Sequence, residues 1–126
     1  MAVIGVGIDI VEVERIERAI TRWGEAFVRR IYTAREVERS AAPIVVGPRM
    51  AARFAAKEAV MKALGVGWRD LSWREIEIAN DSQGKPVVYL HGAARRVAQQ
   101  LGVTEVLLAL SHTHLHAVAN AVAIRK

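Results

Sequence analysis

The sequence predicts an α+β fold in which an antiparallel sheet packs on one long central helix. Three observations lead to this prediction. Residues 2–13 are apolar and rich in β-branched side chains, which is typical of a strand, and residues 105–111 are interpreted as another strand. Residues 49–64 are rich in alanine and lack an internal glycine or proline, which favours a long helix. Residues 73–91 alternate in hydrophobicity on either side of a glycine-containing turn, as a hairpin does.

The first part of the chain is expected to run from a strand into short helices. After the strand over residues 2–13, apolar residues at helical spacing predict a helix over residues 12–23. Gly24 is expected to end this helix, because glycine readily adopts the backbone conformation of a C-cap. A second short helix is expected over residues 25–32.

The middle of the chain begins with Thr33 followed by Glu36, a capping-box spacing that predicts a helix start. Residues 41–48 hold two prolines and a glycine and are the best candidate for a loop. The long helix over residues 49–64 follows, with Gly65 as its expected C-cap.

The last part of the chain is expected to supply most of the strands. Strands over residues 73–79 and 86–91 would be joined by a turn at residues 80–83 and Gly84. The remaining expected elements are a helix over residues 93–101 that Gly102 ends and two strands over residues 105–111 and 116–124.

Composition limits the classes of protein to which the chain can belong. Its 126 residues, of which 52% are apolar, fit a single domain over residues 1–126. The absence of cysteine excludes disulfides and thiolate metal sites. No apolar run reaches the roughly 18 residues of a membrane span, and no basic leader opens the chain, so a cytoplasmic location is expected. The net charge of +5 favours acidic partners.

Glu58 and Lys62 occupy positions i and i+4 of the expected long helix and therefore share one face. One interpretation is an exposed ion pair of small energetic value. Two observations favour a functional role instead. The surrounding segment is strongly apolar, and Arg49, Arg53 and Lys57 place further cations on the same helix.

Asp9 lies in an apolar run, residues 6–11, where a carboxylate is costly to bury unless it is paired or binds a metal. The alternative is a helix cap at the turn from strand to helix, a position that aspartate favours. The residue pattern alone leaves both interpretations open.

Two other patterns are similar to binding motifs without matching them. Gly5-x-Gly7 lacks the third glycine and the lysine of phosphate-binding loops, so neither a Rossmann nor a P-loop site is expected. His112, His114 and His116 alternate as zinc ligands on a strand can, but a turn expected near residues 113–115 would break the alternation. We therefore expect His112 to be a polar contact at a strand end and the other two histidines to lie in solvent.

Several motifs, taken in order, resemble one family. They are Gly5-Val-Gly-Ile-Asp9-Ile, Arg15-Ile16, Arg53-Phe-Ala-Ala-Lys57-Glu58-Ala-Val-Met-Lys62-Ala-Leu-Gly65, Gly84-Lys85-Pro86 and Ser111-His112. Over essentially its whole length the chain resembles the acyl carrier protein synthases, the holo-[acyl-carrier-protein] synthase type of 4′-phosphopantetheinyl transferase. The central Phe-Ala-Ala-Lys-Glu-Ala motif, with a lysine four residues beyond its glutamate, is the most specific part.

The resemblance implies a 4′-phosphopantetheinyl transferase-like fold and a reaction. Such enzymes transfer 4′-phosphopantetheine from coenzyme A to a serine of apo acyl carrier protein, release adenosine 3′,5′-bisphosphate, and support fatty acid biosynthesis. The implied cofactor is Mg²⁺, with Asp9 and Glu58 as its ligands and Lys62 beside the phosphates as the third catalytic residue.

The resemblance also implies a homotrimer with active sites between subunits. The residues framing coenzyme A would be Arg53, Lys62 and Gly65 of one chain and Pro86, Ser111 and His112 of the next. The residues receiving the acidic carrier protein would be Arg15, Arg22, Phe27 and Arg30. Two positions depart from the family pattern: His116 replaces a usual aromatic residue, and Ala19 is small for an apolar docking contact.

Other classes remain as competing interpretations. The basic charge and the arginines on two helices are compatible with a nucleic-acid-binding module. The tryptophans are not interleaved with a basic run, however, so neither nucleic acid nor membrane is expected as a partner. A broad-range phosphopantetheinyl transferase would carry two such half-units in one longer chain. A non-catalytic trimer would have no need of Asp9, Glu58 and Lys62 together.

Overall fold

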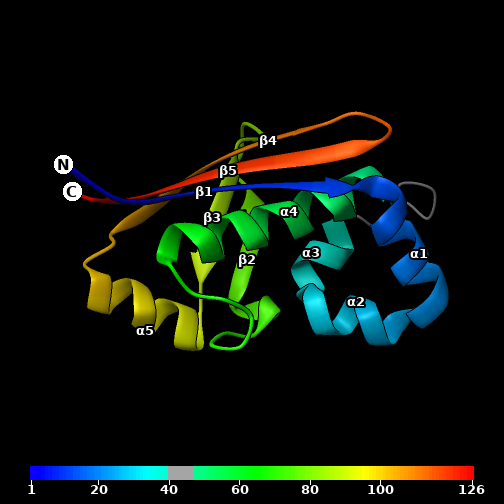
Figure 1. Cartoon of the computed structure of the whole chain (residues 1–126), viewed down its shortest axis with the longest axis horizontal. Helices are drawn as coiled ribbons and strands as arrows, with labels where there is room; N and C mark the ends of the chain where they lie inside the picture. Colours follow the sequence, from blue (N-terminus) through cyan, green and yellow to red (C-terminus); the bar gives the residue numbers. More distant parts are fainter. Residues whose placement is uncertain (40–46) are drawn as a thin grey trace.

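A three-stranded antiparallel sheet joins the two ends of the chain in the computed structural model, which describes residues 1–39 and 47–126. The first strand, β1 (Ala2–Glu12), pairs with the last, β5 (His116–Arg125), and β4 (Glu105–His112) pairs with β5 on its other side. The strand order is therefore β1-β5-β4. The two termini lie side by side at one end of the sheet (Figure 1).

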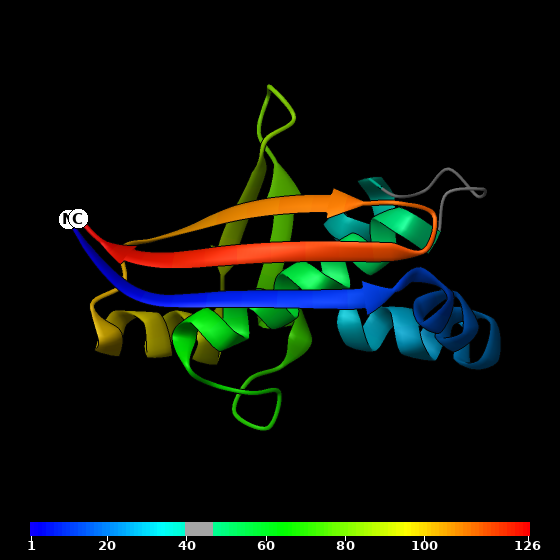
Figure 2. The same cartoon turned by 45° about the horizontal axis from the view of Figure 1, so that its top comes forward.

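The long helix α4 (Gly47–Leu64) packs against one face of this sheet (Figure 2). A Cβ atom on Gly7 would lie 1.9 Å from the backbone oxygen of Ala59, and one on Gly5 would lie 1.9 Å from that of Ala63. Only glycine therefore permits this approach of strand and helix. The central strand adds alanines that are all 0% exposed: Ala117, Ala119, Ala121 and Ala123.

The Gly5-x-Gly7 pattern is thus explained by packing. Because side chains alternate along a strand, Asp9 lies on the same face of β1 as Gly5 and Gly7 and is carried toward α4. Small residues on both elements bring the two backbones close together, and this places Asp9 within reach of side chains on the helix.

Three short helices follow β1 and cover the end of the molecule opposite the chain termini (Figure 1). Gly24 ends the first of them with φ 57°, and its N–H donates to the carbonyl of Ile20. The predicted capping box is confirmed: the N–H of Thr33 donates to Glu36 Oε1 (2.8 Å), and the N–H of Glu36 donates to Thr33 Oγ1 (3.3 Å). The helices are α1 (Val13–Trp23), α2 (Glu25–Ile31) and α3 (Ala34–Arg39).

Helix α4 begins at Gly47, two positions before the predicted start. Most of the loop predicted over residues 41–48 lies outside the described residues. Pro48 lies in the first helical turn. Backbone N–H groups there have no intrahelical acceptor, so the missing N–H of proline breaks no hydrogen bond of the helix. The predicted C-cap is confirmed, because Gly65 has φ 73° and its N–H donates to the carbonyl of Lys62.

The hairpin of β2 (Ile76–Asn80) and β3 (Pro86–Leu90) forms a second, separate antiparallel sheet. The prediction of a strand over residues 73–79 is wrong in its first three positions, which form the 3-10 helix η1 (Trp73–Glu75). The physical reason is a local cap, since the N–H of Ser72 donates to Glu75 Oε1 (2.7 Å).

Helix α5 (Gly92–Leu101) leads from the hairpin to β4 and lies at the same end of the molecule as the chain termini (Figure 1). Gly102 ends it with φ 77°, as predicted. In the part of the chain that the structure describes, no helix combines the length and the hydropathy that a membrane crossing requires.

Candidate active site

Asp9, Glu58 and Lys62 are brought together where β1 crosses α4. The ammonium of Lys62 donates to Asp9 Oδ1 (3.3 Å) and to the backbone carbonyl of Ile8 (2.9 Å). The side chain of Lys62 is 54% exposed, whereas that of Asp9 is only 12% exposed. The second carboxylate oxygen, Asp9 Oδ2, is buried and has no hydrogen-bond partner among the described residues. Such an orphaned buried oxygen is rare in proteins and suits a ligand.

The carboxyl group of Glu58 is half-buried, and the charge of Asp9 acts on it. Burial raises its pKa, and the neighbouring negative charge of Asp9 raises it further, while the cations of Arg15 and Lys62 oppose both effects. Two carboxylates therefore share one partly buried region. A divalent cation would relieve their repulsion.

Both structural alternatives for these residues are wrong. Lys62 forms its ion pair with Asp9, and none with Glu58 exists among the described side chains. Asp9 does not cap helix α1, because it lies inside β1 and the N-cap position is occupied by Glu12.

The donor set at this position fits a hard divalent cation. Mg²⁺ prefers oxygen ligands and commonly takes one or two carboxylates, with waters or phosphate oxygens completing its coordination. Asp9 Oδ2 and Glu58 supply two such carboxylates. Among residues 1–39 and 47–126, no group of three or more His, Cys, Asp or Glu side chains is arranged to hold a metal.

Lys57, one of the cations that the sequence places on this helix, is fully buried. It is 0% exposed, and its ammonium donates to Glu36 Oε1 (2.9 Å) and to the backbone carbonyls of Trp73 (3.1 Å) and Ile76. Burial lowers the pKa of Lys57, and the adjacent carboxylate of Glu36 opposes that shift. The other oxygen of Glu36 accepts from the N–H of Ile78 (2.9 Å). The capping-box pattern in the sequence gave no sign of this second role of Glu36.

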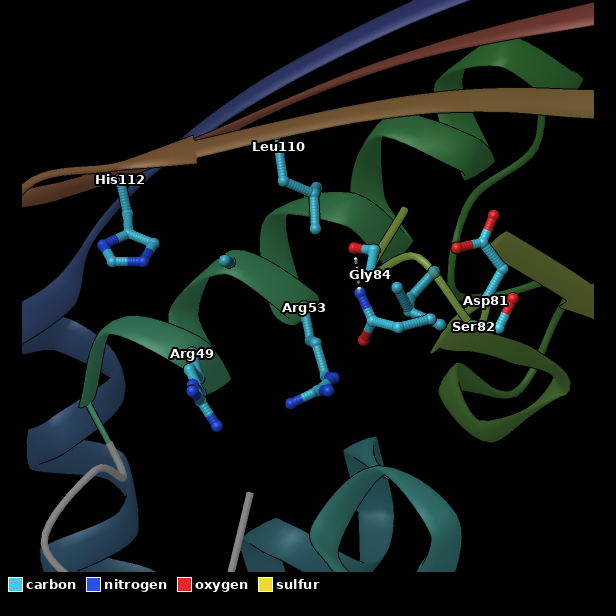
Figure 3. Close-up of a pocket in the computed structure, with 10 residues that line it drawn as sticks. Arg49, Arg53, Asp81, Ser82, Gly84, Leu110 and His112 are labelled. Atoms are coloured by element: carbon cyan, nitrogen blue, oxygen red, sulfur yellow. Dashed lines mark hydrogen bonds between the residues drawn. The ribbon is translucent and has the colours of Figure 1, made fainter. Parts of the chain in front are cut away.

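An open cleft of about 600 Å³ lies between the first half of α4, the hairpin turn and the end of β4 (Figure 3). Arg49 and Arg53 extend into it from α4, and His112 reaches it from β4. The cleft is therefore basic on one side and open enough for an extended anionic ligand. The hairpin contributes Asn80, Asp81, Ser82 and Gly84.

The residues predicted to frame coenzyme A are divided between regions. Arg53 and His112 line the cleft together, but Gly65 lies at the other end of α4, roughly 18 Å along the helix from Arg53. Pro86 begins β3, and Ser111 is exposed beside His112 on β4. Sequence reasoning did not assign Arg49 to the site, although its position four residues before Arg53 on one helix face was a usable signal.

The residues predicted to receive a carrier protein lie on α1 and α2. The guanidinium of Arg15 lies over the ring of Phe54 (5.8 Å), and that of Arg22 lies over the ring of Trp23 (5.0 Å). Arg30 is exposed on α2. Phe27 is half-buried, and its ring packs edge-on against Tyr32 at a centroid distance of 6.3 Å, so only part of it faces outward.

The three histidines near the C-terminus are all exposed. His112 ends β4 and His116 begins β5, with a turn over residues 113–115 between them. The N–H of His116 donates to Thr113 Oγ1 (3.2 Å) inside that turn. The turn breaks the alternation that a strand-borne zinc site would require.

The comparison with protein families agrees with this geometry. Residues 5–119 match the model of the 4′-phosphopantetheinyl transferase superfamily. The chain belongs to that superfamily. A curated relative in the same superfamily, a holo-[acyl-carrier-protein] synthase from Solibacter usitatus, is 50% identical over 115 residues, which cover 88% of this chain and 90% of the relative.

Solved structures of superfamily members agree as well. A holo-[acyl-carrier-protein] synthase from Neisseria meningitidis has a TM-score of 0.87 at 35% identity, and the match covers 98% of this chain and 100% of that one. The same enzyme from Helicobacter pylori, in complex with coenzyme A, has a TM-score of 0.83 at 28% identity over 94% and 99% of the two chains. The predicted α+β fold, the resemblance to acyl carrier protein synthases and the assignment as a phosphopantetheinyl transferase are confirmed.

Proposed function

We propose that the chain transfers 4′-phosphopantetheine from coenzyme A to a serine of apo acyl carrier protein, in a Mg²⁺-dependent reaction that releases adenosine 3′,5′-bisphosphate and supports fatty acid biosynthesis. The observation that carries the proposal is the buried, unpartnered Asp9 Oδ2 beside Glu58, whose pKa is raised first by burial and then by Asp9. Relatives that share up to half of its residues are named holo-[acyl-carrier-protein] synthases.

In this proposal Asp9 and Glu58 hold the metal, because they are the two carboxylates that the fold crowds together. The ion supplies positive charge to the pyrophosphate of coenzyme A, which is otherwise a poor electrophile for a neutral hydroxyl. Asp9 is held on the strand that packs on α4, so the two ligands are fixed by rigid elements and not by loops.

Lys62 has the position to assist the transfer itself. The serine oxygen forms a bond to the phosphorus that carries pantetheine, and the bond from that phosphorus to the bridging oxygen breaks. The ammonium of Lys62 is half-exposed next to Asp9, where it can stabilise negative charge on the phosphates or protonate the leaving oxygen. The proton of the serine goes to a carboxylate or to water oriented by Asp9 or Glu58.

We propose that the basic cleft belongs to the coenzyme site, with Arg53 and His112 facing its phosphates. The related structure from Helicobacter pylori contains coenzyme A, which supports a coenzyme site in this fold. Arg53 and Lys62 belong to α4, whereas Ser111 and His112 belong to β4. Gly65 and Pro86 complete the proposed set.

A homotrimer is proposed on two grounds. The carboxylates lie under β1 and His112 lies on β4, and these strands form opposite edges of the sheet. The outer face of the same sheet is also apolar and exposed, with Val6, Ile8 and Ile10 each at least 60% exposed on β1 and Leu107 41% exposed on β4. Exposed apolar side chains of this kind favour association with further copies of the chain, which would bring the two edges together.

The acidic carrier protein is proposed to meet α1 and α2, through Arg15, Arg22, Phe27 and Arg30. Arg15 is the link between this surface and the site, because its charge acts on Glu58. A bound carrier protein would thereby present its serine close to the carboxylates.

The deciding experiment incubates the chain with apo acyl carrier protein, coenzyme A and Mg²⁺ and follows the carrier by mass spectrometry. The proposal requires a gain of one phosphopantetheine, lost when the metal is chelated and restored when Mg²⁺ is added back. An unchanged carrier mass with wild-type protein that is folded and trimeric by light scattering would refute it.

A further inference from the structure

Trp23, the last residue of α1, is an exposed aromatic side chain in a basic setting. It is 59% exposed, and the guanidinium of Arg22 lies 5.0 Å from its ring centroid. Tryptophan and arginine are the residues that most often dominate protein–protein binding energy. The ring borders a shallow hollow lined by Glu12, Glu14, Arg15, Arg18, Ala19, Arg22 and Trp23.

The charges around this hollow are unequally satisfied. Arg18 is paired with Glu14 through Nη2 and Oε1 at 2.7 Å, so these two charges largely cancel. Arg15 and Arg22 have no carboxylate within ion-pair distance among the side chains that the structure describes, and each lies over an aromatic ring instead. Glu12 also lines the hollow, so three arginines face two glutamates there, beside one apolar ring. The complement of this hollow is an acidic surface with an apolar side chain.

The hollow is connected to the active site by the helix itself. Arg15 acts electrostatically on Glu58, so the first turn of α1 faces the carboxylates. Trp23 lies roughly 12 Å further along the same helix. A protein that placed a serine at the carboxylates and extended along α1 would therefore meet Trp23.

We propose that Trp23 is the apolar anchor for the carrier protein substrate, and that an acidic helical face of the carrier occupies the hollow with an apolar side chain against the indole ring. The inference rests on the proposed function and adds a specificity-determining residue to it. Ala19, four residues earlier on the same helix, is too small to provide such an anchor, and the ring of Trp23 supplies the contact surface that Ala19 lacks.

Trp68 provides a matched control within the same chain. It is 55% exposed, and the guanidinium of Arg69 lies 5.7 Å from its ring centroid, so it has the same side chain, nearly the same exposure and the same kind of arginine contact. It lies in the segment after α4 and does not line the hollow. A change at Trp68 therefore tests the general effect of deleting an exposed indole.

The experiment compares W23A, W23F and W68A in steady-state transfer from coenzyme A to apo acyl carrier protein with Mg²⁺ present. Titration calorimetry with a carrier whose acceptor serine is replaced by alanine measures binding without turnover. We expect W23A to raise both the KM for the carrier and its Kd about tenfold or more, while the KM for coenzyme A stays within about twofold. W23F should retain most of the affinity, and W68A should leave carrier binding unchanged.

The outcomes separate this inference from the proposed function. Transfer by the wild type with W23A indistinguishable from it would overturn the role of Trp23 and leave the proposed function intact. Equal weakening of carrier binding by W23A and W68A would also overturn it, because position on α1 would then not matter. No transfer and no carrier binding by the wild type would overturn both.

Discussion

Helix α4 carries two lysine–carboxylate pairs, little more than one turn apart. The pairs differ in their burial and in how completely their hydrogen bonds are made. Lys57 and Glu36 are both 0% exposed, and the ammonium of Lys57 donates hydrogen bonds to three acceptors. Lys62 is 54% exposed and bonds to one oxygen of Asp9, while the second oxygen stays buried without a partner. The first pair has its hydrogen bonds made within the chain, whereas the second leaves one buried carboxylate oxygen without a partner among the described residues.

The difference teaches how to distinguish the two kinds of pair. A buried ion pair with all its hydrogen bonds made holds elements together, here α4, α3 and β2. A pair with an unsatisfied oxygen and a second carboxylate nearby has a less favourable energy in the free protein.

The largest effect is expected at Lys57. K57M should lower the free energy of unfolding by about 3–5 kcal/mol, because Glu36 is left buried with an uncompensated charge. Urea denaturation at low temperature measures the change. The matched variant K62M should change it by less than about 1 kcal/mol, since the side chain of Lys62 is 54% exposed and solvent screens its charge. Equal destabilisation by both variants would remove the contrast.

The second prediction concerns transfer. D9N and E58Q should each reduce the rate of phosphopantetheine transfer by more than about 100-fold, because each removes one of two anionic metal ligands. Circular dichroism serves as the control for folding. Near-normal turnover of either variant at saturating Mg²⁺ would contradict the assignment of the metal ligands.

The third prediction concerns the basic surface of α1. R22E should raise the KM for the carrier about tenfold, because a like charge then repels an acidic partner, while the KM for coenzyme A is unchanged. R96E, a charge reversal of an exposed arginine on α5, is the control. Parallel loss for both substrates in R22E would indicate misfolding or a coenzyme role instead.

The smallest effect is expected on the stability of the metal-free protein. The folded-state pKa of Glu58 is raised, so its ionisation destabilises the fold at neutral pH, and E58Q should raise the midpoint of thermal unfolding in EDTA. The gain should be under about 1 kcal/mol, because solvent screens a half-exposed carboxyl. It should vanish below the ordinary pKa of 4.5, where Glu58 is protonated. A lower midpoint for E58Q at pH 7 would mean that Glu58 stabilises the fold.

Most of the elements could be predicted because their signals are local. Gly24, Gly65 and Gly102 end their helices as predicted, and the capping box at Thr33 is present. The strand over residues 73–79 was misassigned because its alternation continues through a segment that the side chain of Glu75 holds in a 3-10 turn. Hydrophobic periodicity does not reveal a single side-chain cap of that kind.

The candidate site divides in the same way. Its residue types and order are visible in the chain, and Asp9, Glu58 and Lys62 were singled out for that reason. That they meet depends on Gly5 and Gly7, whose missing side chains let β1 lie directly on α4. This is a contact between distant segments, and no local pattern reports its distance.

By itself, the sequence determined where most of the helices end and which charged residues the chain carries, because capping and periodicity act between neighbours. Only the tertiary structure decided which lysine of α4 is fully buried in an ion pair and which is half-exposed beside Asp9. Lys57 and Lys62 are the same residue type on the same helix, but one points into the space between α3 and β2 and the other toward the exposed edge at β1. Burial is a property of what packs around a side chain, and that is set by segments far away in the chain.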